Sequence, residues 1–232
     1  EELSRVDVER IRKYFEDTKN MNRSQYKDFL RFVSEFPDKK QVIFDILSAD
    51  AVDDIDKYNI VNLVVDVYLP NAGSPQAEIL FAHFTKHKTL SFYKNEKDLL
   101  LNLEPEKLKA SLDAIASMVE SFERFPFQRN LEKFLKLENI SNFPKIKDIF
   151  RYKDNLGDIE RELENFEQLL DVDDVGLEKI LAFLDVAKKR DLGYISLDAL
   201  VKTSQMADVR FKDYIEFITD VTRRSRVSDM QK

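Results

Sequence analysis

Apolar residues recur along most of the chain at positions i, i+3, i+4 and i+7, the spacing typical of amphipathic helices. Capping residues precede several of these stretches, among them Ser4, Ser74 before Pro75, and Ser196. The sequence therefore predicts an all-α fold. We expect helices at 5–17, 23–35, 38–48, 55–69, 75–87, 95–102, 105–122, 127–137, 144–151, 156–170, 174–189, 196–205 and 208–224.

Four segments, 6–36, 56–88, 106–137 and 196–224, each contain two such helices joined by a polar or proline-containing spacer. The closest internal match aligns 26–33 with 211–218 and keeps the order aromatic, Lys, Asp, aromatic, aliphatic, charged, Phe, aliphatic. Shared amphipathicity alone can give this order, so true repetition and coincidence both stay open. A helix pair cannot bury its apolar face alone, so we expect stacked helical hairpins in an α-solenoid-like row.

This pattern of helix pairs resembles the degenerate helical-hairpin repeats of the organellar pentatricopeptide, octotricopeptide and FAST-kinase-like families. The resemblance covers about half of the chain and includes no diagnostic motif, so it implies an architecture and no functional residue. The first residues, Glu1-Glu2-Leu3-Ser4, are neither an initiator methionine nor a signal sequence. A removed organellar presequence and a trimmed chain both fit them, and a mitochondrial location is the expectation.

Composition supports a folded helical protein. Only 4 Gly and 6 Pro occur in 232 residues, which leaves few residues for β-turns, and 43% of the residues are hydrophobic. The absence of cysteine excludes disulfides, thiolate metal sites and cysteine nucleophiles and favours a reduced intracellular compartment. No apolar stretch approaches the roughly 18 residues that a membrane-spanning helix needs, so no membrane span is expected.

Charge is unevenly distributed. Between residues 154 and 178 ten acidic side chains accompany a single basic one, whereas the last segment is basic. We therefore expect helical-hairpin repeats over 1–150, and over 151–232 an acidic helix followed by a C-terminal helical hairpin with a basic tail; one continuous domain is the alternative. Simple solvation of both faces also stays open. The candidate partner-binding residues are Glu160, Glu164, Glu167, Arg223, Arg224 and Arg226.

Two patterns suggest metal binding but lack ligands. His83 and His87 lie four residues apart on one predicted helix face, but no third ligand or catalytic glutamate accompanies them, so we expect a solvated helix end. The loop from Asp17 to Asp28 has the length of an EF-hand loop, with Asn22 at its sixth place, yet Lys and Met occupy its third and fifth places. No metal and no cofactor are expected.

No enzyme motif is present. The sequence has neither a Gly-x-Ser-x-Gly elbow nor a glycine-rich phosphate loop, and nothing selects a catalytic pair among its 44 carboxylates. Most aromatic residues fall on apolar helix faces, where they are expected in the core. This core set comprises Phe29, Phe32, Phe81, Phe84, Phe122, Phe134, Phe183 and Phe217.

The sequence therefore predicts a non-catalytic helical scaffold or adaptor subunit of a larger, mitochondrial protein complex that acts through contacts with other protein subunits. The alternative is an RNA-associated organellar repeat protein that contacts phosphates through its basic C-terminal helix. The net charge of −7 disfavours RNA, because non-specific nucleic-acid affinity depends on clustered Lys and Arg. An enzyme whose site is assembled from scattered carboxylates is the third possibility.

Overall fold

The computed structural model describes residues 5, 8–9, 11–13, 22–49, 54–87 and 96–229, with side chains throughout these ranges except at 54–56 and 221–229. Within this part of the chain the elements are helices, and the β contact is an isolated parallel bridge between Leu156 and Ile195. The expected all-α fold is therefore confirmed. The first expected helix, 5–17, lies largely outside the described residues.

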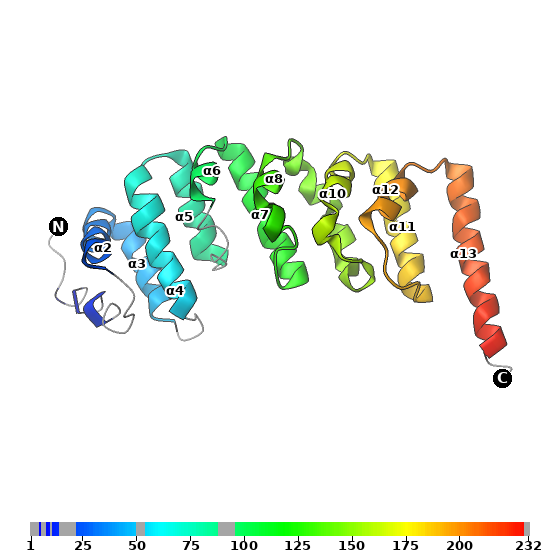
Figure 1. The fold of residues 1–232 in the computed structure, drawn as a ribbon, viewed down its shortest axis with the longest axis horizontal. Helices are drawn as coiled ribbons and strands as arrows, with labels where there is room; N and C mark the ends of the chain where they lie inside the picture. The colour runs from blue at the N-terminus through cyan, green and yellow to red at the C-terminus, as the bar shows by residue number, and fades with distance from the viewer. Residues whose placement is uncertain are drawn as a thin grey trace. The chain divides into compact units, whose positions relative to one another are not determined.

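The chain forms two compact units, Glu1–Lys109 and Ala110–Lys232 (Figure 1). The division falls within helix α7 (Pro105–Phe122), and the change expected at residue 150 from the charge pattern lies inside the second unit. Each unit is a packed group of helices. The stacking of hairpins into a solenoid stays a prediction.

The first unit packs its helices around a long, irregular one. Helix α4 (Asp54–Asn62) continues as a π-helical turn, η1 (Leu63–Tyr68), and a 3₁₀ turn, η2 (Leu69–Asn71). The π turn shifts the helix face by one residue, and it contacts both α2 and α5. Four further helices of this unit within the described residues are α2 (Arg23–Glu35), α3 (Pro37–Leu47), α5 (Pro75–His87) and α6 (Lys97–Leu101).

An aromatic cluster forms the core of the first unit. The ring of Phe32, fully buried, lies 5.8 Å from that of Tyr68 and 6.2 Å from that of Phe81. The Tyr68 hydroxyl donates a 2.6 Å hydrogen bond to Glu78, which also forms a 3.0 Å ion pair with Lys39. Burial raises the pKa of Tyr68, and its hydrogen bond to Glu78 raises the pKa further. The hydroxyl group of this buried tyrosine therefore has a hydrogen-bond partner in Glu78.

His83 is buried, so the expectation of a solvated helix end is wrong for this residue. Its side chain is 7% exposed because it shares the apolar face of α5 with Leu80 and Phe84. Its Nε2 nitrogen finds no hydrogen-bond partner among the described residues. Burial, followed by the nearby charges of His87 and Lys86, lowers the pKa of His83 from 6.5 to about 3. His83 is therefore a neutral core residue at neutral pH.

This burial predicts acid sensitivity. Below about pH 6.5 the unfolded chain protonates His83 while the folded chain does not until about pH 3, so lowering the pH through this window favours unfolding. At pH 5 the loss of unfolding free energy from this group is about 2 kcal/mol relative to pH 8. Denaturant unfolding at both pH values should show that His83→Leu loses about 2 kcal/mol less than the unchanged protein. Equal losses in the two proteins would contradict this account.

The second unit contains most of α7, which is followed by a series of short helices. The expected helix 156–170 is wrong over its first half, where Leu156 forms the β-bridge and a 3₁₀ turn, η6 (Ile159–Arg161), precedes α10 (Leu163–Leu170). The short helices are η3 (Gln128–Asn130), α8 (Leu131–Lys136), η4 (Ile140–Asn142), α9 (Phe143–Ile146) and η5 (Lys147–Asn155). The last three are α11 (Asp174–Arg190), α12 (Leu197–Ser204) and α13 (Asp208–Asp229).

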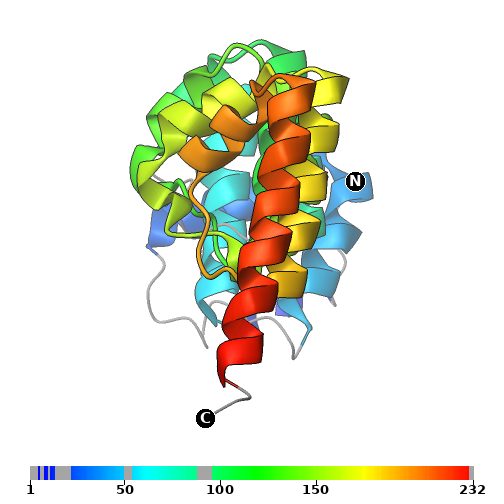
Figure 2. The ribbon, with the colours of Figure 1, turned by 90° about the vertical axis from the view of Figure 1, so that its right-hand side faces the viewer.

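Helix α11 is the centre of the second unit, because η5, α12 and α13 all pack against it. Figure 2, which looks onto the C-terminal end of the chain, shows α13 running alongside α11. Phe127, Phe134 and Phe166 are fully buried with neighbouring ring centroids 5.0 to 5.9 Å apart, which gives this unit an aromatic core of its own. The two helices expected in the hairpin 196–224 are present as α12 and α13. The principal contacts of α13 are, however, with α11 and not with α12.

Candidate functional site

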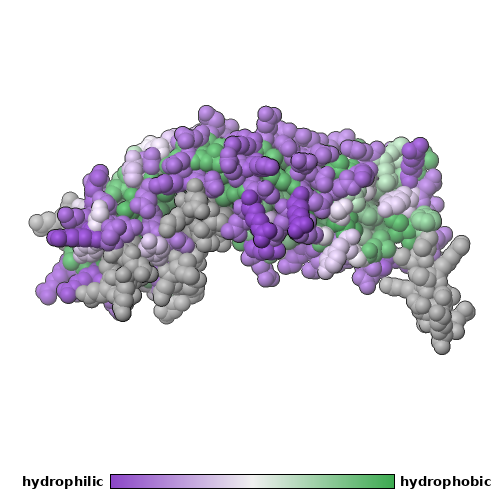
Figure 3. Space-filling view, viewed as in Figure 1, coloured by the Kyte–Doolittle hydropathy of each residue, from purple (hydrophilic) through white to green (hydrophobic). Residues whose placement is uncertain are grey.

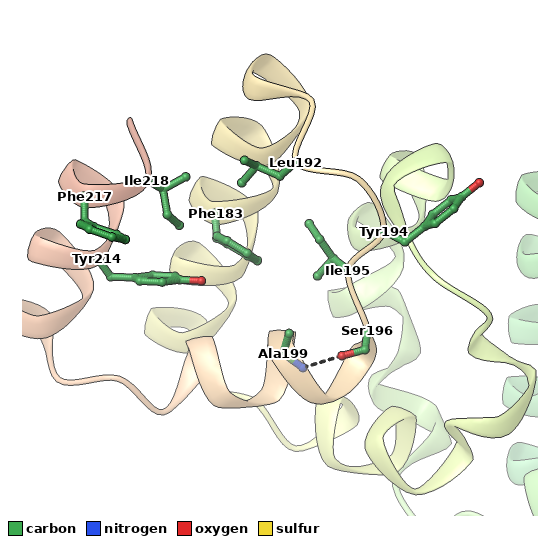
Figure 4. A pocket seen from close by; sticks show the side chains of 9 residues that line it. All are labelled: Phe183, Leu192, Tyr194, Ile195, Ser196, Ala199, Tyr214, Phe217 and Ile218. Atoms are coloured by element: carbon green, nitrogen blue, oxygen red, sulfur yellow. Dashed lines mark hydrogen bonds between the residues drawn. The ribbon is translucent and has the colours of Figure 1, made fainter. Parts of the chain in front are cut away.

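An apolar groove lies beside α13 at the end of the second unit (Figure 4). It has a volume of about 430 Å³ and is bounded by α11, α13, the start of α12 and the extended segment 192–196 that precedes α12. No acidic, basic or histidine side chain lines it. The lining residues are Phe183, Leu192, Tyr194, Ile195, Ser196, Ala199, Tyr214, Phe217 and Ile218.

The walls of the groove are held by local interactions. Ile195 donates a 2.7 Å backbone hydrogen bond to Asn155 and accepts one of 2.9 Å from Gly157, which fixes the extended segment. The Ser196 hydroxyl accepts a 3.2 Å hydrogen bond from the Ala199 amide and so caps α12, as Figure 4 shows. Ser196 is the one serine or threonine that lines the groove, and its hydroxyl is already engaged in this cap. The groove therefore chiefly offers apolar contact.

Helix α13 is anchored at its first turn. The Lys179 ammonium group of α11 forms a 2.7 Å ion pair with Asp208 and a 2.7 Å hydrogen bond to the Met206 carbonyl. Further along, the rings of Phe183 and Tyr214 lie 5.8 Å apart. These contacts attach one side of α13 to α11.

None of the described side chains of α13, at 208–220, is buried. Phe217 is 64% exposed although it was expected in the core, so that prediction is wrong. The physical reason is that, within the described part of the chain, α13 has its principal contacts with α11 alone. Apolar residues reach the surface at this end of the second unit (Figure 3). The water-exposed surface of α13 thus includes the large apolar side chain of Phe217.

The internal sequence match allows the exposure of Phe217 to be compared with that of its aligned residue in the first unit. Phe32 of α2 aligns with Phe217 of α13, and Val33 aligns with Ile218. Phe32 and Val33 are 0% and 1% exposed because α3, α5 and the π turn surround α2, whereas Phe217 is mostly exposed and Ile218 only half-buried. Similar residues are therefore enclosed in one unit and left open in the other.

The three candidate glutamates do not form one acidic surface. Glu160 forms a 2.6 Å ion pair with Arg124. Glu164 and Glu167 are exposed on α10, where they line a cleft of about 540 Å³ together with basic side chains. The basic residues in that cleft are Lys133, Lys136 and Arg161. The negative charge is therefore balanced locally, which weakens its field at a distance.

Other acidic residues of the same segment cap helices. Asp158 accepts a hydrogen bond from the Glu160 amide at the start of η6, and Asp173 accepts one of 2.7 Å from the Gly176 amide at the start of α11. Glu162 accepts a 3.0 Å hydrogen bond from the Asp198 amide at the start of α12. Since helix N-termini carry unpaired amides and a partial positive charge, these acidic residues stabilise the fold.

Arg223, Arg224 and Arg226 all belong to the second half of α13. Their side chains lie outside the described ones. Of the six candidate residues, these three are therefore on the helix that forms the groove, and the three glutamates are elsewhere in the second unit. Sequence reasoning missed Tyr214 and Phe217 as site residues, because amphipathic spacing and the internal match do not show whether a neighbouring helix covers them.

The EF-hand-like loop has a helical cap at its centre. The Asn22 side chain accepts hydrogen bonds of 2.9 Å from the amides of Ser24 and Gln25, and the Gln25 side chain accepts one from the Asn22 amide, which forms a capping box. The part of the loop before Asn22 lies outside the described residues. Among the described residues no group of three or more His, Cys, Asp or Glu is placed to hold a metal ion.

Adding millimolar Ca²⁺ or Zn²⁺ should therefore leave the melting temperature unchanged, because an ion that binds only the folded state must raise it. Thermal unfolding with and without each ion checks this. An upward shift with calcium that disappears in the double variant Asp17→Asn, Asp28→Asn would overturn it.

Comparison of the chain with protein-family models, curated proteins and solved structures found no match. The resemblance to organellar helical-hairpin repeats therefore stays a prediction. None of the helices in the described part of the chain is long and apolar enough to span a membrane. The groove beside α13 is therefore the candidate functional site.

Proposed function

We propose that the chain is a non-catalytic helical scaffold or adaptor subunit of a protein complex and that it binds protein through the groove beside α13. The observation that supports this is Phe217, which is 64% exposed at the edge of an apolar groove. Aromatic anchors next to apolar pockets are typical of the centre of protein interfaces. Helix-in-groove recognition uses surfaces of this kind.

The energetics favour a partner. Complete burial of a phenylalanine side chain contributes about 1.5–3 kcal/mol relative to leaving it in water. The fold buries only about a third of the Phe217 side chain, so most of this free energy is gained only when a partner covers it. Tyr214 and Ile218 are half-buried, so part of their contribution is also gained on binding. A partner that covers the groove gains this free energy without unfolding any element of the chain.

The groove also favours protein over RNA as the ligand. Its lining carries no charged side chain, whereas RNA recognition starts from clustered basic side chains that neutralise phosphates. A mitochondrial complex is part of the proposal on the strength of the resemblance to organellar repeats. Imaging of the tagged protein in its own cells tests the location directly.

Replacing Phe217 with Glu should remove the partner proteins that copurify with the tagged chain from its own cells, because a charged side chain cannot be buried in an apolar contact without a large cost. Quantitative mass spectrometry of the copurifying proteins measures the loss, which should be at least about tenfold for a hot-spot residue. The fold should survive, since substitutions at exposed positions change the free energy of unfolding by only about 0.5 kcal/mol.

Val175→Glu is the matched control, because Val175 is 54% exposed on α11 and does not line the groove. Retention of all partners by Phe217→Glu would contradict the proposed surface. The triple variant Arg223→Glu, Arg224→Glu, Arg226→Glu tests the RNA-binding alternative. Loss of copurifying RNA from this variant, with its protein partners unchanged, would favour that alternative over the proposed function.

A further inference from the structure

We infer that the occupant of the groove is helix α13 of a second copy of this chain, so that two copies pair through antiparallel α13 helices about a two-fold axis. The inference rests on the proposed function, since it names the partner of the same groove. It is carried by two features of α13 together: the exposed aromatic ring of Phe217 and the distribution of charge along the length of the helix.

The two halves of α13 carry opposite charge. Over 208–220 four acidic residues accompany two basic ones, and over 221–229 three basic residues accompany one acidic one. Asp213, Glu216 and Asp220 are all exposed. An antiparallel pair places the acidic half of each helix against the basic half of the other, whereas a parallel pair would place like charges together. The charge pattern therefore favours the antiparallel arrangement of two identical helices.

Symmetry adds to this. In a two-fold contact every residue contributes twice, so a single exposed phenylalanine supplies two apolar anchors to the same interface. The 22 residues of α13 give a helix of about 33 Å, long enough for the apolar residues to meet near its middle with charges on either side. Antiparallel packing also aligns the two helix dipoles favourably.

Helix α13 is held ready for such a contact. The ion pair between Lys179 and Asp208 and the packing of Tyr214 on Phe183 attach its first half to α11. The same first half presents Phe217 at the groove, so pairing requires no rearrangement of the unit. The partner helix would bring its own Phe217 to this apolar surface and its basic half to Asp213 and Glu216.

The molar mass of the purified chain, measured by analytical ultracentrifugation over a range of micromolar concentrations, tests the inference. We expect association to twice the 27.3 kDa mass of a single chain. Phe217→Glu should weaken self-association at least about tenfold, and Val175→Glu should leave it unchanged.

A charge exchange tests the antiparallel arrangement. In an acid-reversed variant Asp213, Glu216 and Asp220 become Lys, and in a base-reversed variant Arg223, Arg224 and Arg226 become Glu. Each variant alone sets like charges against each other, so each should self-associate about tenfold more weakly or worse. Mixing the two in equal amounts restores opposite charge at both ends, so a mixed dimer should form with an affinity close to that of the unchanged chain.

Three outcomes would overturn the inference: a monomeric mass at every concentration, reversed variants that dimerise as well as the unchanged chain, or a mixture that fails to associate. Failure of the inference can be told apart from failure of the proposed function. A monomer whose copurifying proteins still depend on Phe217 would retain the groove as a protein-binding surface with a different occupant. A dimer unaffected by Phe217→Glu would overturn the inference alone, whereas copurifying proteins retained by the same variant would overturn the proposed function.

Discussion

Both units of this chain depend on the burial of the apolar stripe that each amphipathic helix carries, because no other interaction in them is large enough to offset the cost of ordering the chain. In the first unit this requirement is met: Phe32 lies among Tyr68, Phe81 and their neighbours and is fully buried. In the second unit α11 is covered by η5, α12 and α13. Helix α13 is where the requirement is only partly met, and its open face is the basis of the functional proposal.

Ion pairs and charged hydrogen bonds act locally in this chain, in addition to the burial of apolar helix faces. The acidic residues between 154 and 178 suggested a charged surface for partners, yet Asp158, Glu162 and Asp173 accept hydrogen bonds from amides at helix starts. Glu160 pairs with Arg124. Much of this acidity therefore stabilises the starts of helices, among them α11 and α12. The charge pattern of α13 differs, because it is segregated along one helix with an exposed face.

Much of the fold could be predicted from the spacing of apolar residues. Helix α7 begins at Pro105 and ends at Phe122 as expected, and α5 matches its expected bounds from Pro75 to His87. Residues 147–151 and 159–161 were expected in α-helices and form 3₁₀ turns, whose period is close enough to that of an α-helix to give a similar apolar spacing. The π turn at 63–68 was not expected either, because it lies within a longer helix whose apolar spacing it interrupts only locally.

The candidate site was less predictable. Amphipathic spacing shows which residues of α13 share a face, but it does not show whether a neighbouring helix covers that face. Phe32 and Phe217 have matching local sequences and opposite exposures, so only the packing distinguishes them. His83 gave the converse error, since a polar residue on an apolar face was assumed to reach solvent and is buried.

The central claim is that protein covers the exposed side of α13, which carries Phe217, when the chain is in its assembly. Hydrogen–deuterium exchange of the backbone amides of α13 tests this claim most directly. The measurement compares the dilute purified chain with the same chain in the assembly isolated from its own cells. The account predicts slower exchange over 208–220 in the assembly and unchanged exchange in α2, whose apolar face is already enclosed. Equal exchange over 208–220 in the two samples would contradict it.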